Sequence, residues 1–334
     1  MKAVYIREFG AAENLEIREV ENPPSPQNAE VLVRVRAAAL NRADVLQRQG
    51  FYPAPSGYPE RIPGLEFAGE IVETGAHAPG FKTGDRVFGI TAGGAQAEFI
   101  LTDASLLAKI PARLSFVEAA AVPEAFITAH DAVFAQGALR TDETLLIHAV
   151  GSGVGLAALQ LAKAREIRTF GTSRTADKLE KCARFGLDEG ILTDGDAAAE
   201  NPKFFAEKIA AKTGGRLADV ILDLVGARYF AANLESLNVK GRLLLVGLTG
   251  GRTAQFDLGA ALTKRARIIG TVLRSRPRAE KAEAHRLFVN EVLPLLASGK
   301  IQPNIDRIFR FDEIRAAHER LESNESFGKI VLEF

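Results

Sequence analysis

The stretch Ala149-Val150-Gly151-Ser152-Gly153-Val154-Gly155 is a glycine-rich turn between two different kinds of sequence. Before it, residues 144–150 are mostly apolar and short enough for a buried strand, and after it residues 156–164 predict a helix. Glycines let a backbone approach a pyrophosphate, and a helix N-terminus offers free N–H groups and the positive end of the helix dipole. The stretch therefore predicts a phosphate-binding turn, and the alternative is a tight strand-to-helix turn without a ligand.

The end of the next strand distinguishes the two nicotinamide dinucleotides. Residues 167–172 predict this strand, which is followed by Ser173 and Arg174, with Lys178 one helical turn later. An NAD enzyme usually has Asp or Glu here for the ribose 2′-hydroxyl, whereas cations and a hydroxyl suit a 2′-phosphate. The position and the charge predict NADPH, and the alternative is a solvated basic start to a helix.

The pattern of strands and helices changes along the chain. Residues 1–123 are β-rich, with period-two alternation in 31–36, whereas strands and helices alternate over 124–264, including an expected helix over 124–134. Alternation of this kind predicts a parallel sheet covered on both faces. We therefore expect an α/β fold in which a Rossmann-type doubly wound domain, 124–264, is inserted into a β-rich domain made of 1–123 and 265–334. The second segment of that domain is expected to hold a strand over 267–272, a long helix over 280–297 and a closing strand over 329–332.

Composition limits the function classes. Lys plus Arg and Asp plus Glu are 42 each, so no net charge attracts polyanions, and nucleic acid is an unlikely partner. The single cysteine, Cys182, allows no internal disulfide and no thiolate zinc site, and we interpret it as an apolar filler on a helix. No signal peptide and no apolar run of about 18 residues is present. We expect a cytoplasmic protein without a membrane partner.

Several segments together resemble a known family. They are residues 39–44, 47–50, 122–129, 152–155, 273–276 and 328–332. Through them the whole chain resembles the medium-chain dehydrogenase/reductase superfamily, and within it the zinc-free NADPH:quinone oxidoreductases related to zeta-crystallin, especially the stress-inducible branch. The resemblance implies that the β-rich domain is GroES-like and that the protein is a homodimer. The expected strand 267–272, at the sheet edge, would pair with its two-fold mate.

The resemblance also implies the cofactor-binding residues. It places Ser152, Gly153 and Val154 on the pyrophosphate, and Ser173, Arg174 and Lys178 around the 2′-phosphate. Along the nicotinamide half of the cofactor or the cleft it places Thr128, Val246, Gly247, Leu248, Leu273, Arg274, Ser275 and Lys329. No second nucleotide motif appears, so we expect no flavin.

The resemblance further implies a reaction without a metal. Zinc-dependent relatives take ligands from a cysteine and from a Gly-His-Glu motif, and the matching positions here hold Asn41 and Leu65. Without a Lewis acid, alcohol oxidation is disfavoured. A quinone suits such a site, because hydride addition gives an aromatic hydroquinone anion that needs little acid help.

Two residues are our candidates for catalytic polar groups. Asn41 would orient the nicotinamide ribose or the substrate carbonyl, and the alternative is that it caps a helix starting at residue 42 or 43. Tyr52 lies in a proline-rich loop expected to overhang the cleft, and the alternative is a surface ring packed on prolines. We interpret Asp44 as structural, paired with Arg42 or Arg48, and His148 as a core histidine with its hydrogen bonds satisfied.

Three functions compete at this point. The first is NADPH-dependent quinone reduction, by one or two electrons. The second is reduction of the C=C bond of an enone or enoyl thioester, for which Arg274, Arg276 and Arg278 would line the mouth of an acyl-carrier channel. The third is a non-catalytic, crystallin-like protein that keeps NADPH as a structural ligand, with RNA binding as a minor variant.

Overall fold

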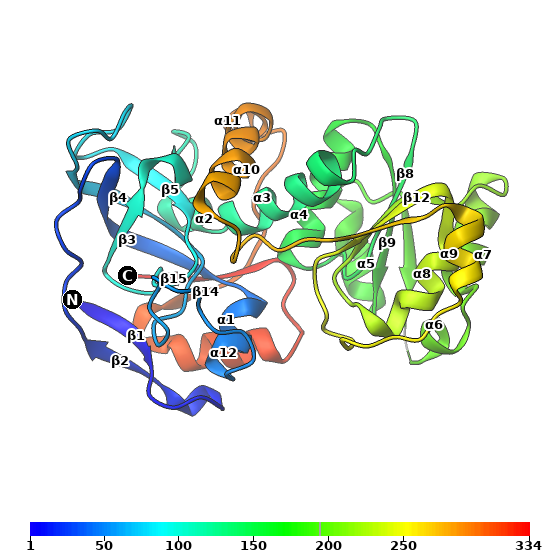
Figure 1. Cartoon of the computed structure of the whole chain (residues 1–334), viewed down its shortest axis with the longest axis horizontal. Helices are drawn as coiled ribbons and strands as arrows, with labels where there is room; N and C mark the ends of the chain where they lie inside the picture. The colour runs from blue at the N-terminus through cyan, green and yellow to red at the C-terminus, as the bar shows by residue number, and fades with distance from the viewer. Residues whose placement is uncertain (194) are drawn as a thin grey trace. The chain divides into compact units, whose positions relative to one another are not determined.

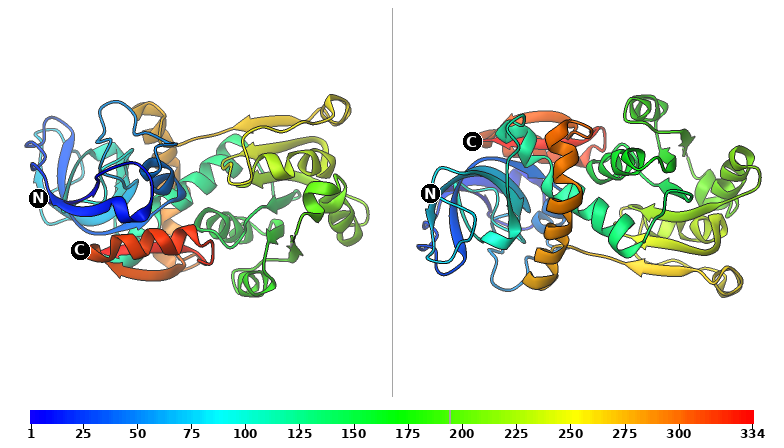
Figure 2. Two further views of the ribbon diagram at one scale, coloured as in Figure 1. Left: turned by 90° about the horizontal axis from the view of Figure 1, so that it is seen from below. Right: turned by 90° about the horizontal axis from the view of Figure 1, so that it is seen from above.

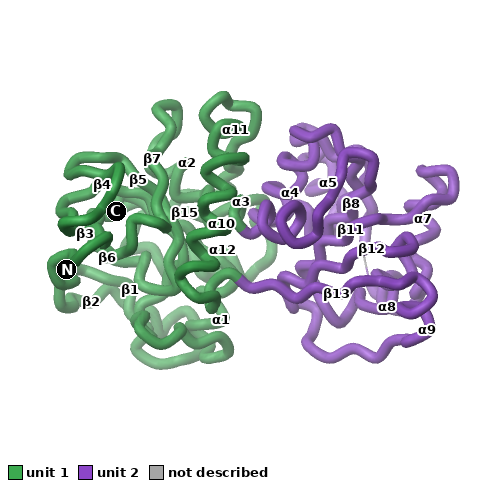
Figure 3. Tube along the Cα trace, turned by 45° about the horizontal axis from the view of Figure 1, so that its top comes forward, with its two compact units in different colours: residues 1–127, 273–334 green, residues 128–272 purple. Residues whose placement is uncertain are grey.

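The computed structural model describes residues 1–193 and 195–334, which form two compact units (Figure 3). Unit 1 comprises Met1–Ile127 and Leu273–Phe334, and unit 2 comprises Thr128–Val272. The sequence pattern predicts domain boundaries after residues 123 and 264, whereas the units change after Ile127 and Val272. Unit 2 is therefore inserted into unit 1.

Unit 2 contains one six-stranded sheet in which every neighbouring pair of strands is parallel. The spatial order is β10-β9-β8-β11-β12-β13, the order of a Rossmann fold. The strands are β8 (Thr144–Ile147), β9 (Arg168–Ser173), β10 (Glu189–Leu192), β11 (Ala218–Asp223), β12 (Leu237–Leu245) and β13 (Arg267–Gly270). The direction of the winding reverses between β8 and β11, and ligands of such sheets bind at the carboxyl ends of the strands beside this reversal.

Helices connect these strands, as a parallel sheet requires (Figure 1). They are α4 (Gly153–Ala164), α5 (Ala176–Ala183), α6 (Ala197–Glu200), α7 (Phe204–Thr213), α8 (Phe230–Ser236) and α9 (Leu258–Lys264). The four residues of β8 are all buried, because helices cover both faces of the sheet. The α/β fold and the strand-turn-helix prediction at residues 144–164 are confirmed.

The expected strand at 267–272 belongs to unit 2 and not, as predicted, to the β-rich unit. Residues 267–270 form β13, which pairs in parallel with residues 242–245 of β12. Its apolar residues favour a strand, but sequence alone does not tell which sheet the strand joins. The structure shows that β13 is an edge strand of the unit 2 sheet.

Unit 1 contains a seven-stranded sheet and a separate pair of strands, β1 (Lys2–Ile6) and β2 (Leu15–Glu19). The order of the larger sheet is β14-β15-β3-β4-β5-β7, with β6 also paired to β3. Its strands are β3 (Glu30–Leu40), β4 (Glu66–Thr74), β5 (Arg86–Ile90), β6 (Phe99–Asp103), β7 (Leu107–Lys109), β14 (Ile305–Arg310) and β15 (Lys329–Glu333). Val31, Val33 and Val35 of β3 are buried while Arg34 is exposed, which confirms the period-two prediction for this segment.

The helices of unit 1 are α1 (Arg42–Arg48), α2 (Phe116–Ala120), α10 (Arg278–Glu291), α11 (Leu293–Ser298) and α12 (Ile314–Glu322). In Figure 2, α12 runs beside β14 and β15. It packs through Ile314 and Ala317 into a core shared with Leu332 of β15 and Ile6 of β1. This packing covers one part of the sheet of unit 1.

Two helix predictions need correction. The long helix expected over 280–297 is divided into α10 and α11 at Val292, because Pro294 has no N–H to continue the ladder of α10. The helix expected over 124–134 begins one residue earlier, as α3 (Pro123–His130), and its continuation, Asp131–Gln136, is wound as a π-helix. In residues 1–193 and 195–334, no helix has the length and apolar character needed to cross a lipid bilayer.

Candidate functional site

The glycine turn of unit 2 has the geometry that lets a ligand approach its backbone closely. Ser152 is the N-cap of α4, and its Oγ accepts a hydrogen bond from the N–H of Gly155 at 3.1 Å. A Cβ on Gly155 would lie 2.6 Å from the carbonyl oxygen of Ala149, so only glycine fits there. The N–H groups of Gly153 and Val154 meet no acceptor among the residues that the structure describes. Two free donors at a helix N-terminus are a suitable site for a pyrophosphate.

A chain of buried hydrogen bonds fixes this turn to the sheet. His148 Nδ1 lies 3.0 Å from Thr172 Oγ1 and its Nε2 lies 2.6 Å from Asn233 Oδ1. Asn233 in turn donates to Asp223 Oδ2 at 3.0 Å. The N–H of Ala149 donates to the same Thr172 hydroxyl. Burial lowers the pKa of His148, so the imidazole is neutral, and its interpretation as a satisfied core histidine is confirmed.

The end of β9 presents the cationic residue that sequence analysis proposed. Ser173 is buried, and its Oγ accepts a hydrogen bond from the N–H of Thr175. Arg174 is exposed and forms no hydrogen bond or ion pair within the described part of the chain. Lys178 lies in the first turn of α5 and is partly buried. The Arg174 guanidinium is therefore available to an anionic ligand.

The remaining candidates of unit 2 follow β12 or lie in α3. The N–H groups of Val246 and Gly247 both donate to the carbonyl oxygen of Asp223, at 2.9 and 3.2 Å. A Cβ on Gly247 would lie 2.7 Å from the carbonyl oxygen of Leu224, and Leu248 is 48% exposed. Thr128 is partly buried in α3. The loop after β12 is thus tied to β11, whose carboxyl end lies beside that of β8.

Unit 1 holds a buried cluster of charges at the meeting point of several elements. Lys329, the first residue of β15, lies 2.7 Å from Glu66 Oε1, and these side chains are 7% and 0% exposed. Asn41 joins the pair, because its Nδ2 donates to Glu66 Oε1 at 2.9 Å and its Oδ1 accepts from Lys329 Nζ at 2.6 Å. Both ends of the Asn41 amide are therefore held in a fixed orientation.

Asn41 stands at the N-cap position of α1, as the alternative interpretation has it, and forms a capping box with Asp44. In this box Asp44 reaches back and accepts the N–H of Asn41 at 2.7 Å, and it also accepts that of Gly64 at 2.9 Å. The predicted pairing of Asp44 with Arg42 or Arg48 is wrong, because each arginine has acceptors elsewhere, on Leu321 and Glu322 respectively. Burial raises the pKa of Asp44 to about 6, against the effect of its two N–H donors.

The buried side chain of Arg274 joins three segments of unit 1 through hydrogen bonds. Its guanidinium donates to the carbonyl oxygens of Ala92 at 2.8 Å and Tyr52 at 3.0 Å, and to Gln47 Oε1 at 2.5 Å. It also lies 5.0 Å from the centre of the Tyr52 ring. The ring of Tyr52 therefore packs against this cation, and burial raises the pKa of its hydroxyl. Next to Arg274, Leu273 is buried and Ser275 is exposed.

Arg274 and Arg278, two of the arginines considered for the mouth of an acyl-carrier channel, differ in their exposure. Arg274 is only 4% exposed and is held by its three acceptors. Arg278 is exposed and pairs with Asp103 at 2.9 Å. Arg274 therefore cannot bind a phosphate group without losing these acceptors, whereas Arg278 has further N–H groups exposed to solvent.

Four candidates from the sequence, Asn41, Tyr52, Arg274 and Lys329, thus lie around one cluster in unit 1. Sequence reasoning did not find the roles of Gln47, Glu66, Glu124 and Lys281 in this cluster. The N–H of Glu124, at the start of α3, donates to Glu66 Oε2 at 2.8 Å. A glutamate after a proline signals the first turn of a helix, but nothing local shows which carboxylate it will meet.

Potential metal ligands do not gather in the described chain. Residues 1–193 and 195–334 contain no group of three or more His, Cys, Asp or Glu side chains placed to hold a metal ion. Leu65, at the histidine position of the zinc-dependent relatives, is a buried alkyl side chain. Cys182 is buried, and burial raises the pKa of its thiol to about 12, which confirms its interpretation as a core residue.

Two family models match the chain. One, described as an alcohol dehydrogenase GroES-like domain, covers residues 27–112, and one, described as a zinc-binding dehydrogenase, covers residues 153–290. Quinone oxidoreductase from Pseudomonas aeruginosa is 32% identical over 99% of both chains. Quinone oxidoreductase from Rattus norvegicus is 29% identical over 99% of this chain and 97% of its own.

Solved structures of similar proteins have the same fold as this chain. A quinone oxidoreductase from Pseudomonas syringae has a TM-score of 0.87 at 28% identity, over 100% of this chain and 99% of its own. A mycobacterial protein solved with NADPH has the same TM-score and identity over both whole chains. The CurK enoyl reductase has a TM-score of 0.85 at 25% identity, over 99% of this chain and 98% of its own. The chain belongs to the medium-chain dehydrogenase/reductase superfamily and, within it, to the quinone oxidoreductase family.

Proposed function

We propose that the protein is an NADPH-dependent, zinc-independent reductase of quinones that acts in the cytoplasm. The observation that carries this proposal is the end of β9, where exposed Arg174 has no partner within the described chain, beside the hydroxyl of Ser173. The free N–H groups of Gly153 and Val154 suit the pyrophosphate of the same ligand. A 2′-phosphate adds negative charge and acceptor oxygens that suit a guanidinium.

NADPH, when bound, supplies the hydride. The residues of unit 1 then bind and orient the acceptor. Asn41 is suited to this task, because Lys329 and Glu66 fix its amide and Lys329 places positive charge 2.6 Å from its oxygen. One N–H of its Nδ2 donates to Glu66, and the other, whose nitrogen lies 3.5 Å from the carbonyl oxygen of Ala39, would donate to a substrate carbonyl without moving during the reaction. Tyr52 contributes an aromatic ring held by Arg274, which suits the flat face of a quinone.

The donor set of unit 1 supports a reaction without zinc. Leu65 provides no ligand atom, and Asn41 has an amide in place of the thiolate of the zinc-dependent relatives. Glu66 is the remaining residue of the motif, and its carboxylate already binds the ammonium of Lys329 at 2.7 Å. A metal ion at Glu66 would have to displace that ammonium.

Quinones are the substrate class we favour. Most of the similar proteins described above are named quinone oxidoreductases, and hydride addition to a quinone gives an aromatic anion that takes its proton on oxygen. Reduction of an enone or enoyl thioester is the second candidate, because the CurK enoyl reductase shares the fold at 25% identity. A phosphate-bearing acyl carrier would, however, compete with the existing acceptors of Arg274.

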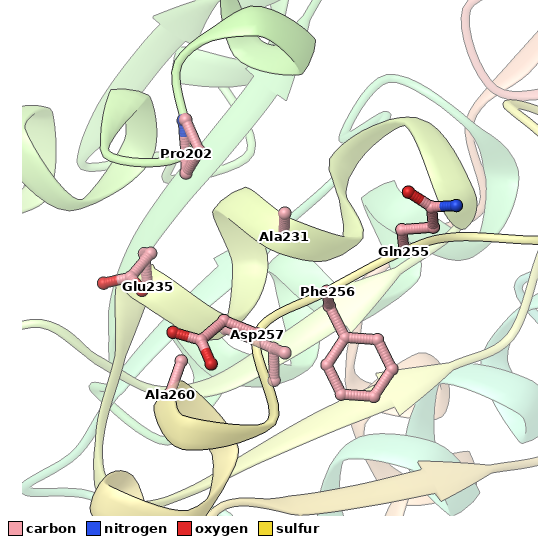
Figure 4. Close-up of a pocket in the computed structure, with 8 residues that line it drawn as sticks. Pro202, Ala231, Glu235, Gln255, Phe256, Asp257 and Ala260 are labelled. Carbon is pink, nitrogen blue, oxygen red and sulfur yellow. The ribbon is translucent and has the colours of Figure 1, made fainter.

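We also propose a homodimer formed through β13. This strand is an edge of the sheet of unit 2, and Ile268 and Val272 are 41% and 51% exposed. The preceding helix, α9, buries none of its residues, and its Leu258 and Leu262 are 74% and 75% exposed. A groove of about 510 Å³ beside α9 is lined by Phe256, Asp257 and Ala260, among others (Figure 4). An open strand edge with apolar residues is suited to pairing with a second copy of the chain.

Replacing Arg174 tests the phosphate site. We expect Arg174→Ala to raise the Kd of NADPH about tenfold, equivalent to about 1.4 kcal/mol, and to leave that of NADH unchanged, because only NADPH has the 2′-phosphate. Calorimetric titration of the full chain with each dinucleotide measures both values. Arg184→Ala, at the opposite end of α5, is the control and should change neither. Equal weakening of both dinucleotides would contradict the assignment.

Parallel assays decide between the two substrate classes. With NADPH saturating, we expect 1,2-naphthoquinone to give a kcat/KM at least tenfold higher than crotonyl-CoA, because hydride addition to a quinone needs no proton on carbon. The oxidation of NADPH at 340 nm reports both reactions. Faster reduction of crotonyl-CoA would establish the second candidate, and NADPH binding without turnover of any quinone would favour a crystallin-like binding protein.

The dimer is tested by a charge on the strand edge. We expect the wild-type protein to sediment with twice its chain mass of 35.9 kDa. Ile268→Lys should give the single-chain mass, because a lysine on an edge strand opposes pairing. Ile308→Lys is the matched control, since Ile308 is 50% exposed on β14, an edge of the sheet of unit 1. A wild-type protein that is monomeric at micromolar concentration refutes the interface.

A further inference from the structure

The charge cluster of unit 1 contains one carboxyl group that differs from the others. Asp44 accepts two backbone N–H groups, and Glu66 accepts from Asn41, Lys329 and the N–H of Glu124. The carboxyl group of Glu124 itself has no hydrogen-bond donor and no ion-pair partner within the described chain, and its side chain is only partly buried. Glu124 therefore belongs to the cluster through its backbone, while its carboxyl group is not used by the fold.

The charges around Glu124 come from several elements. Carboxylates lie on α1 and at the start of β4, cations lie on the segment after β13, on α10 and on β15, and one phenol lies on the loop after α1. These neighbours are Asp44, Glu66, Arg274, Lys281, Lys329 and Tyr52. Two of these cations already have partners other than Glu124. Lys329 is paired with Glu66, and Arg274 donates to Gln47. Neither of these two cations forms an ion pair with Glu124.

This environment favours the protonated acid. Burial, and after it the Glu66 carboxylate, raise the pKa of Glu124 to about 8 against the opposing effect of Lys329. Below that value a neutral carboxylic acid is present, with an O–H to donate. A proton donor works best when its pKa is close to the working pH.

We propose that Glu124 is the proton donor for the substrate anion formed in unit 1. The inference rests on the proposed function, because that reaction forms the anion. Hydride addition breaks one C=O π bond of the quinone and leaves a hydroquinone monoanion. The O–H bond of Glu124 then breaks, a new O–H bond forms on the anion, and the neutral hydroquinone leaves. The carboxylate takes a proton from water, so that the sum is one hydride and one proton added to the quinone. With an enone, the same donor would deliver its proton to the carbon beside the carbonyl group.

A different explanation is that Glu124 only stabilises α3, since an acidic residue in the first turn of a helix interacts favourably with the helix dipole. That role requires the ionised form at neutral pH, whereas a proton donor requires the neutral form. The charge of Glu124 at pH 7 therefore separates the two roles without any cofactor or substrate.

The first test is a titration of the ligand-free full chain. With glutamate labelled by ¹³C at the carboxyl carbon, we expect one resonance that titrates with a midpoint near 8 and disappears in Glu124→Gln. Glu280→Gln is the control, because Glu280 is exposed in the first turn of α10, and it should leave that resonance in place. If every glutamate is ionised at pH 7, Glu124 is not the donor, whatever the enzyme reduces.

The second test is the pH profile of kcat with NADPH and 1,2-naphthoquinone. We expect the wild-type kcat to fall as the pH rises through about 8, because the acid form is lost. Glu124→Gln should lower kcat about 100-fold with little change in KM and remove this pH limb, and Glu124→Asp should restore part of the rate. An unchanged kcat and pH limb in Glu124→Gln overturns the proposal. A wild-type protein that reduces no quinone refutes the proposed function instead, and the titration still decides whether Glu124 holds a proton.

Discussion

The ion pair between Glu66 and Lys329 is the interaction on which the organisation of unit 1 depends. It joins the first residues of β4 and β15 at 2.7 Å, with both side chains almost fully buried. Two charges removed from water are costly unless each is paired and hydrogen-bonded. Asn41, at the end of β3, and the N–H of Glu124, at the start of α3, provide the additional hydrogen bonds. The buried pair needs these hydrogen bonds to offset the loss of its hydration. They therefore hold Asn41 and Glu124 next to the pair.

In unit 2, too, buried polar side chains satisfy one another through hydrogen bonds, here around a neutral imidazole. His148, Asn233 and Asp223 satisfy one another below the glycine turn, so that the turn is held without a charge on the imidazole. At the carboxyl ends of β8 and β9, two backbone N–H groups and the Arg174 guanidinium meet no partner among the described residues, and all three suit a phosphate. In both units, polar groups that are fixed by hydrogen bonds lie next to polar groups that have no partner in the described chain. We interpret the open groups as the ones that meet ligands.

Local sequence predicted what depends on local chemistry. The glycine turn, the cation at the end of β9 and the period-two strand near residue 33 are each encoded within a few residues, and the structure has the turn, the exposed Arg174 and the alternating burial. The sheet that β13 joins, the break of the predicted long helix and the cluster of unit 1 were not predicted in full. Gln47 meets Arg274 across 227 residues of sequence, and Glu66 meets Glu124 across 58. Such contacts are products of topology, and no pattern near either residue encodes them. Arg274 illustrates the limit, because nothing in its family motif predicts that its guanidinium donates to Ala92, Tyr52 and Gln47.

A double-mutant cycle on the ion pair tests the account most directly. Urea unfolding of Glu66→Gln, Lys329→Met and the double variant gives the coupling free energy between the two side chains. We expect each single variant to lose about 3–5 kcal/mol, because it leaves a buried charge without its partner. The double variant should lose clearly less than the sum of the two. Strictly additive losses would show that the two charges do not depend on each other, and would contradict the role assigned to the pair.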